Sequence, residues 1–152
     1  MKAVLQRVSS AKVETGGRIA GEIGQGLLIL LGVTGKDGVD EADFLAEKSA
    51  NLRIFEDENG KLNRSLLDVG GGMLIVSNFT LCADARHGRR PSFTNAAGPE
   101  AANSLYERFV AAAKDTGIAT VQTGVFRADM QISLVNDGPV TILLDTDEIM
   151  KK

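Results

Sequence analysis

Two short segments place hydroxyl, amide and turn-forming residues directly after apolar runs. The first is Ser77-Asn78-Phe79-Thr80, which follows Met73–Val76, and the second is Asn136-Asp137-Gly138-Pro139, which follows Ile132–Val135. Each apolar run predicts a buried strand, and strand ends are where a rigid scaffold commonly holds reacting groups. The first segment offers successive backbone N–H groups and two hydroxyls. Such a set suits hydrolysis of an activated ester by water, because the donors stabilise the oxyanion.

The chain has little material for a general-base triad. It contains one histidine, His87, and one cysteine, Cys82, and no Ser or Cys has an evident His/Asp system. A cysteine hydrolase would need Cys82 and His87 within hydrogen-bond reach, which five residues of loop do not ensure. A buried, inert thiol is the common alternative. One His and one Cys without clustered ligand spacing predict no metal site, and we expect no cofactor.

Gly138 and Pro139 form a dipeptide suited to a rigid backbone contact. Glycine lets main chain approach a ligand closely, and X-Pro is the peptide bond whose cis isomer lies only ~0.5–1 kcal/mol above trans. Stiff backbone beside a substrate Cα would distinguish handedness by collision, whatever the side chain. The alternative is a turn between two antiparallel strands, because Asp-Gly is a common hairpin signal. The proline that follows disrupts the usual two-residue hairpin.

Arg7 lies among apolar residues of the first predicted strand and shares the parity of Leu5. An inward arginine must be paired or bonded to carbonyls, since an unpaired buried charge is costly. The alternative is an exposed strand arginine, because arginine is mostly exposed.

A basic loop follows the first segment and contains Arg86, His87, Arg89 and Arg90. These side chains suit the phosphates at the end of an RNA, and Phe93 suits a stacked base. A solvated loop is the default alternative. The net charge of −3 and the pI near 5.2 argue against a long electrostatic footprint on nucleic acid, but they permit a local grip.

The elements that position these residues predict one α+β domain over residues 1–152. Alternating and continuous apolar patterns predict strands at 2–13, 18–23, 26–33, 73–78, 119–123, 129–136 and 140–145. Helical spacing predicts helices at 41–53, capped by Asp40, and from Pro99 to a stop at Gly117. Segments 55–72 and 82–97 are predicted to be loops. Because strands outnumber helices without regular βαβ alternation, we expect largely antiparallel pairing.

The 43% hydrophobic and 24% charged content is typical of a globular protein. No apolar run approaches the roughly 20 residues that cross a bilayer, and the opening residues do not form a signal peptide. A single cysteine fits a reducing compartment, so we expect a cytoplasmic protein.

Together, the two segments resemble the motifs of the D-aminoacyl-tRNA deacylases, whose members carry Ser-Gln-Phe-Thr-Leu and a Gly-Pro pair. The likeness begins at Met1-Lys2-Ala3-Val4-Leu5-Gln6-Arg7-Val8 and extends to the closing strand. It implies the fold of that family, which is a barrel-like roll of antiparallel β-sheets with two main helices. It also implies that a homodimer hydrolyses the ester of D-aminoacyl-tRNA, and of glycyl-tRNA, without a cofactor.

The resemblance assigns catalytic and gating roles to individual residues. Backbone groups of Ser77, Asn78, Phe79 and Thr80 would hold the aminoacyl ester while the terminal ribose assists hydrolysis. A nucleophilic Thr80 is the alternative. Gly138 and a cis Pro139, inserted from the partner subunit and oriented by Arg7, would reject L-aminoacyl substrates.

The resemblance also implies a binding surface for the tRNA 3′ end. Phe126 and Met130 would line the pocket for the terminal nucleotide, although core packing alone is an alternative explanation for both. Arg86, Arg89 and Arg90 would contact tRNA phosphates.

Two residues depart from the family pattern. Asn78 stands where members usually carry Gln, which withdraws the amide by one carbon–carbon bond, ~1.5 Å. Arg127 stands where Gly is common, and it either adds a phosphate contact or crowds the pocket. These departures leave room for a catalytically silent module that binds RNA ends. A third interpretation is a small-molecule esterase that uses Ser77 or Thr80 covalently.

Overall fold

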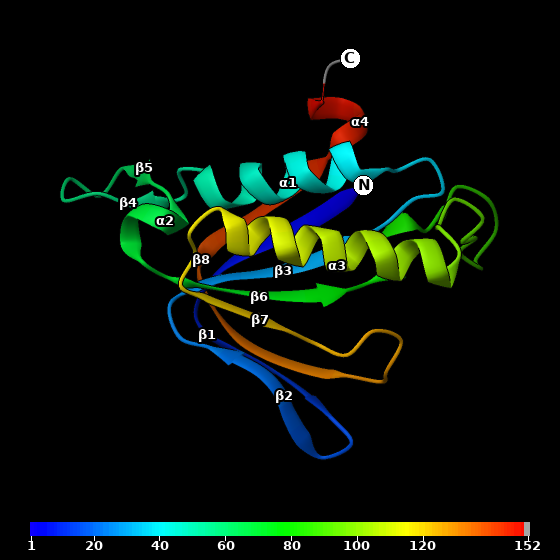
Figure 1. The fold of residues 1–152 in the computed structure, drawn as a ribbon, viewed down its shortest axis with the longest axis horizontal. Helices are drawn as coiled ribbons and strands as arrows, with labels where there is room; N and C mark the ends of the chain where they lie inside the picture. The colour runs from blue at the N-terminus through cyan, green and yellow to red at the C-terminus, as the bar shows by residue number, and fades with distance from the viewer. Residues whose placement is uncertain (151–152) are drawn as a thin grey trace.

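In the computed structural model, which describes residues 1–150, a curved sheet carries both long helices on one face (Figure 1). The sheet contains β1 (Lys2–Thr15), β2 (Arg18–Ile23), β3 (Gly26–Gly32), β6 (Gly72–Ser77), β7 (Thr120–Thr123) and β8 (Gln131–Asp145). A separate ribbon pairs β4 (Phe55–Glu56) with β5 (Leu62–Arg64). The helices are α1 (Val39–Asn51), α2 (Leu66–Val69), α3 (Pro99–Asp115) and α4 (Thr146–Ile149), with a 3-10 turn, η1 (Phe79–Cys82).

The sheet is mixed. Its strand order is β2-β1-β3-β6-β7, and β8 pairs with β1 as well. β1 is antiparallel to β2, β3 and β8, whereas β3, β6 and β7 run parallel. The α+β fold with two main helices is confirmed. The pairing is not largely antiparallel throughout, because α1 lies between β3 and β6, and α3 between β6 and β7. Both connections are long enough for the crossover that parallel strands need.

The sheet curls towards closure because β1 is long. It has 14 residues and pairs with β3 along its first half and with β2 along its second half. The hairpin strand β2 then approaches β7, since a Cβ on Gly21 would lie 2.7 Å from the Thr123 carbonyl oxygen. The barrel-like shape is therefore produced by one bent strand.

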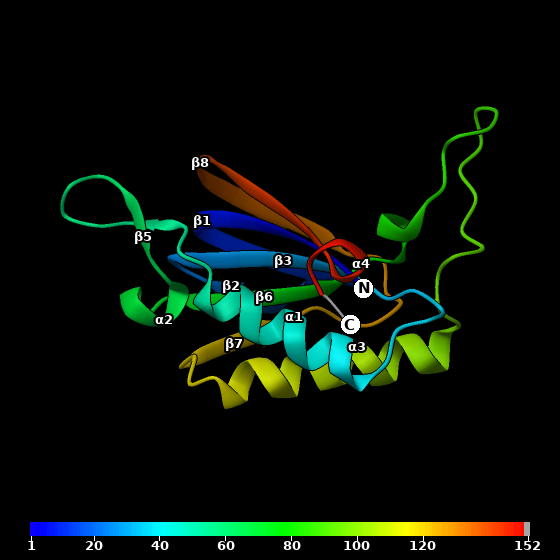
Figure 2. The same ribbon diagram turned by 90° about the horizontal axis from the view of Figure 1, so that it is seen from above.

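β3 is buried on both faces, as its apolar run predicts. Leu27, Ile29 and Leu31 join the core beneath the helices, whereas Leu28 packs into a second cluster inside the curl. The helices close the first core with Ala42, Leu45 and Ala46 from α1 and Tyr106, Phe109 and Ala113 from α3. Figure 2 shows α1 and α3 side by side on the same face of the sheet.

β8 differs from the prediction of two strands at 129–136 and 140–145. It is one strand, paired with β1 along almost its whole length. Between the pairs Gln6↔Thr141 and Val8↔Asn136, β1 advances two residues while β8 advances five. The Asp137–Val140 segment therefore bulges out of the ladder opposite Arg7 instead of forming a hairpin turn.

Helix ends follow local signals with one correction. α1 begins at Val39 and its N-cap is Gly38, whose N–H donates to Glu41 Oε2 at 2.8 Å, so the predicted cap at Asp40 is wrong. Pro99 begins α3 as predicted, and Gly117 follows its end at φ 101°. The predicted loop 55–72 contains β4, β5 and α2. Among residues 1–150, no helix is long and apolar enough to span a membrane.

Gly26→Ala tests the close approach of β3 to β6. Gly26 pairs with Gly72, and a Cβ on Gly26 would overlap the Gly72 carbonyl oxygen. We expect the free energy of unfolding to fall by at least about 1–3 kcal/mol, measured by urea denaturation. Gly24→Ala is the matched control, because a Cβ there meets no atom within 4 Å. Equal stability of the two variants would contradict this packing.

Candidate active site

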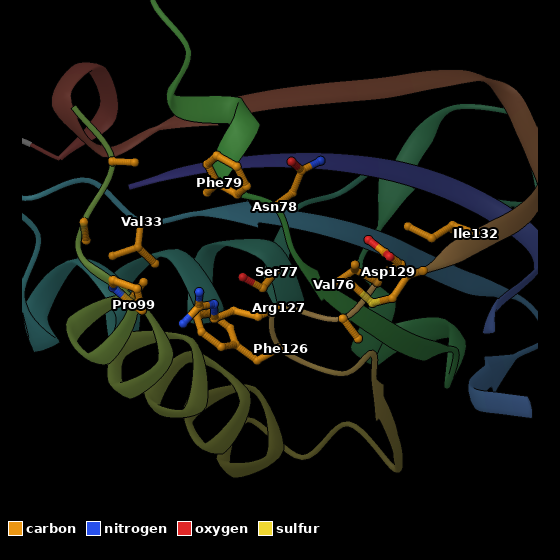
Figure 3. Close-up of a pocket in the computed structure, with 15 residues that line it drawn as sticks. Val33, Val76, Ser77, Asn78, Phe79, Pro99, Phe126, Arg127, Asp129 and Ile132 are labelled. Carbon is orange, nitrogen blue, oxygen red and sulfur yellow. The ribbon is translucent and has the colours of Figure 1, made fainter. Parts of the chain in front are cut away.

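A cavity of about 550 Å³ opens at the carboxyl end of β6 (Figure 3). Its walls come from the end of β6 with the start of η1, the loop and first turn of α3 over residues 96–102, the chain over residues 126–132 that leads into β8, and Val33 just after β3. The predicted site residues that line it are Ser77, Asn78, Phe79, Phe126 and Met130. Arg127 and Asp129 are the charged residues of its wall. The structure thus brings the first segment, which begins at Ser77, together with Phe126 and Met130, the two residues expected at the terminal nucleotide.

The cavity exists because β7 leaves β6 after Thr123. The Ile75 carbonyl accepts the Gly124 N–H at 3.1 Å and the buried Tyr106 hydroxyl at 2.7 Å. Burial raises the pKa of Tyr106 to about 12, so the phenol stays a neutral donor. Its ring also lies against Phe126, with centroids 6.2 Å apart. Tyr106 therefore ties α3, β6 and the pocket wall together.

The backbone amides of the first motif are mostly occupied. Asn78 N–H donates to Leu31 O at 2.8 Å, Thr80 N–H to Asn78 Oδ1 at 3.2 Å, and Leu81 N–H to Asn78 O at 3.3 Å. Within the described chain, the Phe79 N–H has no hydrogen-bond partner. An amide without an internal acceptor beside a cavity is suited to an external oxyanion. Phe79 therefore offers the clearest such donor of this segment.

Asn78 uses its side chain locally. Its Oδ1 caps η1 and accepts both the Thr80 amide and the Thr80 hydroxyl. A neutral amide oxygen is not a general base, so this contact does not activate the hydroxyl as a nucleophile. The departure at position 78, where Asn stands in place of the usual Gln, therefore concerns the N-cap of η1. Asn is among the residues preferred at such a cap.

Cys82 is buried, and its Sγ lies 3.5 Å from the Val33 carbonyl oxygen. Burial raises the pKa of this thiol, which keeps it protonated at neutral pH. His87 lies in the exposed part of the loop. The geometry therefore favours the inert thiol over a Cys–His pair. Among residues 1–150, no three His, Cys, Asp or Glu side chains form a potential metal site.

The basic loop projects from the body beyond η1, as the green loop of Figure 2 shows. Arg86 is engaged within it, donating from Nε and Nη2 to Asp84 at 2.9 and 2.8 Å. These bonds hold the pKa of Asp84 at about 2. Arg89 and Arg90 are exposed and have no acidic partner in the described chain. They are thus the arginines of this loop that are available to a phosphate.

Arg7 points inward, as its parity predicts, and is 6% exposed. Its Nε donates to the Asp137 carbonyl at 2.8 Å and its Nη1 to the Ile54 carbonyl at 3.0 Å. The carboxylates of Glu56 and Asp137 lie 3.7 and 3.4 Å from the guanidinium. Arg7 therefore holds the start of the bulge that carries Gly138 and Pro139.

The bulge is secured from its other side by Asn136. Its Nδ2 donates to Arg7 O at 3.0 Å and to Val140 O at 3.1 Å. The Gly138–Pro139 peptide bond is cis. A Cβ on Gly138 would overlap the Asn136 side chain and the Val140 nitrogen. The sequence places Asn136 in the second segment without indicating a positioning role, and it indicates no role for Tyr106 at the site. An Asn just before Asp-Gly-Pro was an available signal, whereas Tyr106 resembled any core aromatic.

The bulge and the β6 end do not meet within one chain. Arg7 pairs with Leu27, and Leu27 pairs with Met73, which lies four residues before Ser77. Because the bulge lies on β8, on the other side of β1, the separation is on the order of 13 Å along the strands and about 14 Å across three strand spacings. Neither Gly138 nor Pro139 lines the cavity.

Comparison with known proteins identifies the family. The family model for D-Tyr-tRNA(Tyr) deacylase matches residues 4–145. A D-aminoacyl-tRNA deacylase of Clostridioides difficile (strain 630) is 58% identical over 148 residues, covering 97% of this chain and 99% of the relative. One from Roseiflexus castenholzii (strain DSM 13941 / HLO8) is 62% identical over 146 residues, covering 96% and 92%.

Solved structures show the same fold. The c-Myc DNA Unwinding Element Binding Protein has a TM-score of 0.90 at 40% identity, covering 95% of this chain and 98% of that chain. A probable eukaryotic D-amino acid tRNA deacylase has a TM-score of 0.80 at 14% identity, which shows a shared fold, over 94% and 97% of the two chains. The chain belongs to the D-aminoacyl-tRNA deacylase family, whose enzymes are hydrolases that act on ester bonds. The resemblance seen in the sequence is confirmed.

Proposed function

We propose that this protein hydrolyses the ester of D-aminoacyl-tRNA, releasing a D-amino acid and intact tRNA, and that it accepts glycyl-tRNA as well. The observation that carries the proposal is the unpartnered Phe79 amide beside a cavity of about 550 Å³ in a chain of this family. That volume is within the range of small-molecule pockets and accommodates a nucleoside with its ester. Because aminoacyl-tRNA is the substrate of translation, the protein would act in the cytoplasm.

The terminal adenosine would lie between Phe126 and Met130, with its ester towards the end of β6. Water attacks the ester carbonyl carbon, and the oxyanion accepts a hydrogen bond from the Phe79 N–H. The C–O bond to ribose then breaks, the ribose oxygen takes up a proton, and the vicinal ribose hydroxyl assists. Because the ester is already activated, positioning and oxyanion stabilisation suffice without a covalent intermediate.

Handedness would be judged by the backbone of Gly138 and Pro139 from a second copy of the chain. The bulge lies too far from the cavity of its own chain to touch a substrate there. Arg7 and Asn136 hold it rigid, and rejection by collision requires rigidity more than affinity. An L-side chain would strike this backbone, a D-side chain would point away, and glycine has no side chain to strike it.

The surface of β8 supports a homodimer. Among residues 1–150, β8 pairs with β1 along one edge and with no strand along the other, and it exposes Leu134, Val135 and Leu143 by 36%, 57% and 70%. An apolar edge strand that stays uncovered is prone to pair with other chains. A second copy seated on this strand would cover these residues and would deliver its own bulge.

The activity is tested with D-Tyr-tRNA, L-Tyr-tRNA and Gly-tRNA. We expect release of D-tyrosine and of glycine, with L-Tyr-tRNA left intact, measured by acid-precipitable aminoacyl-tRNA over time. Equal rates on the D- and L-substrates, or none on either, would defeat the proposal. Binding of tRNA without turnover would favour the silent RNA-end-binding module instead.

Phe79→Pro tests the oxyanion donor. Proline fits the first position of a helical turn and removes an N–H that has no internal partner, together with the exposed ring that lies against Phe93, so the fold should persist. We expect kcat to fall by about 10²–10³. Phe79→Ala, which keeps the amide, is the control and should retain most of the rate.

The covalent esterase makes the opposite prediction for the hydroxyls. With a main-chain site, Ser77→Ala and Thr80→Val should keep kcat within about tenfold of the parent, because neither hydroxyl is the nucleophile. Loss of activity in either variant, with Phe79→Pro unaffected, would support that rival.

A further inference from the structure

Arg127 has a backbone conformation that arginine disfavours. Its φ is 66°, and within residues 1–150 every other residue with a positive φ is a glycine. The Ala128 N–H donates to the Val125 carbonyl at 3.2 Å, so Arg127 occupies the third position of a β-turn that requires positive φ there, as in type II. An L-residue in this region is strained, and such strain concentrates at ligand sites.

The strained turn presents Arg127 to the cavity. Phe126 and Arg127, the two central residues of the turn, both line it. Figure 3 shows the guanidinium over the pocket on the side of Pro99, where α3 begins. The side chain is exposed and, in the part of the chain that the structure describes, has no carboxylate within ion-pair distance. The arginine charge is therefore available to a ligand.

The other charged group of the wall lies elsewhere in the pocket. Asp129 also lines the cavity, but in Figure 3 it lies at the opposite end, near Ile132. An anionic group would consequently be attracted to the Arg127 end and repelled from the Asp129 end. The cavity is thus electrostatically polarised along its length.

We propose that Arg127 binds a phosphodiester adjacent to the terminal nucleoside and so makes the pocket prefer a polynucleotide end over a free aminoacyl-nucleoside. The inference rests on the proposed function, which seats the nucleoside against Phe126. The neighbouring guanidinium then meets the backbone of the strand that enters the pocket. Its planar fork matches phosphate oxygens, and such contacts position a nucleic acid without reading its sequence.

The test compares two substrates that differ in phosphate content: D-Tyr-tRNA and D-tyrosine esterified to the 3′ hydroxyl of adenosine. The variants are Arg127→Gly and Arg127→Asn, which both tolerate positive φ and lack the guanidinium. Arg18→Gln is the control, because it removes an exposed positive charge from β2, away from the cavity.

We expect KM for D-Tyr-tRNA to rise about 5- to 10-fold in both Arg127 variants. KM for the adenosine ester should stay unchanged in both. The salt dependence of log KM on tRNA should also weaken by about 0.7, which corresponds to one lost phosphate contact. Arg18→Gln should leave both quantities unchanged. The melting temperatures of the Arg127 variants should equal or exceed that of the parent, because the strain is relieved.

Three results would overturn the inference while leaving the deacylase activity intact: unchanged KM on tRNA, an equal rise on both substrates, or faster turnover of the variants. The last would mean that Arg127 crowds the pocket. Failure of the parent protein on both substrates would instead defeat the proposed function. Arg127 is then judged by binding of deacylated tRNA across a salt series, where an unaltered affinity in Arg127→Gly rejects the phosphate contact.

Discussion

The Ile75 carbonyl is the junction on which the site depends. It accepts the Gly124 amide, where the parallel pairing of β6 and β7 ends, and the Tyr106 hydroxyl, which reaches it from α3. Beyond this point β6 continues to Ser77, whereas the segment that follows β7 turns away from it. The space between the two segments is the cavity. One oxygen thus fixes the end of β6, the axial position of α3 and, through the ring of Tyr106, the wall that contains Phe126.

The two motifs are positioned by different mechanisms. The end of β6 is held by β3, which pairs with it as far as Ser77 and accepts the Asn78 N–H at Leu31 O, and the η1 turn is closed by the Asn78 side chain. The Gly138–Pro139 bulge is rigid because a buried arginine and an asparagine fill the gap that it leaves in the ladder. In the proposed site, main chain would meet the substrate in both places, which suits an enzyme that must accept many side chains. Their separation within one chain is the structural reason for proposing two copies.

Local signals in the sequence predicted what local forces determine. The doubly buried β3 followed from its continuous apolar run, and the ends of α3 from Pro99 and Gly117. Strand parity gave the inward direction of Arg7, but its partner Ile54 lies 47 residues away and left no sequence signal. Asp-Gly-Pro suggested a turn from its local residue types. The segment is instead a bulge within one strand, because β8 pairs on both sides of it with β1, which is distant in the sequence. The positive φ of Arg127 depends on a turn whose conformation its residue type disfavours, so only the structure revealed it.

We propose that a complete site combines the cavity of one chain with the bulge of another, and heterodimers test this arrangement directly. One chain would carry Phe79→Pro, which disables its cavity, and the other Pro139→Gly, which loosens its bulge. If the bulge acts on the partner's cavity, the single working cavity meets a native bulge. Purified heterodimers should then hydrolyse D-Tyr-tRNA and spare L-Tyr-tRNA. Hydrolysis of L-Tyr-tRNA at the rate per working cavity of the Pro139→Gly homodimer, which is half of that homodimer's rate per dimer, would contradict the claim, because it would place each bulge at the cavity of its own chain.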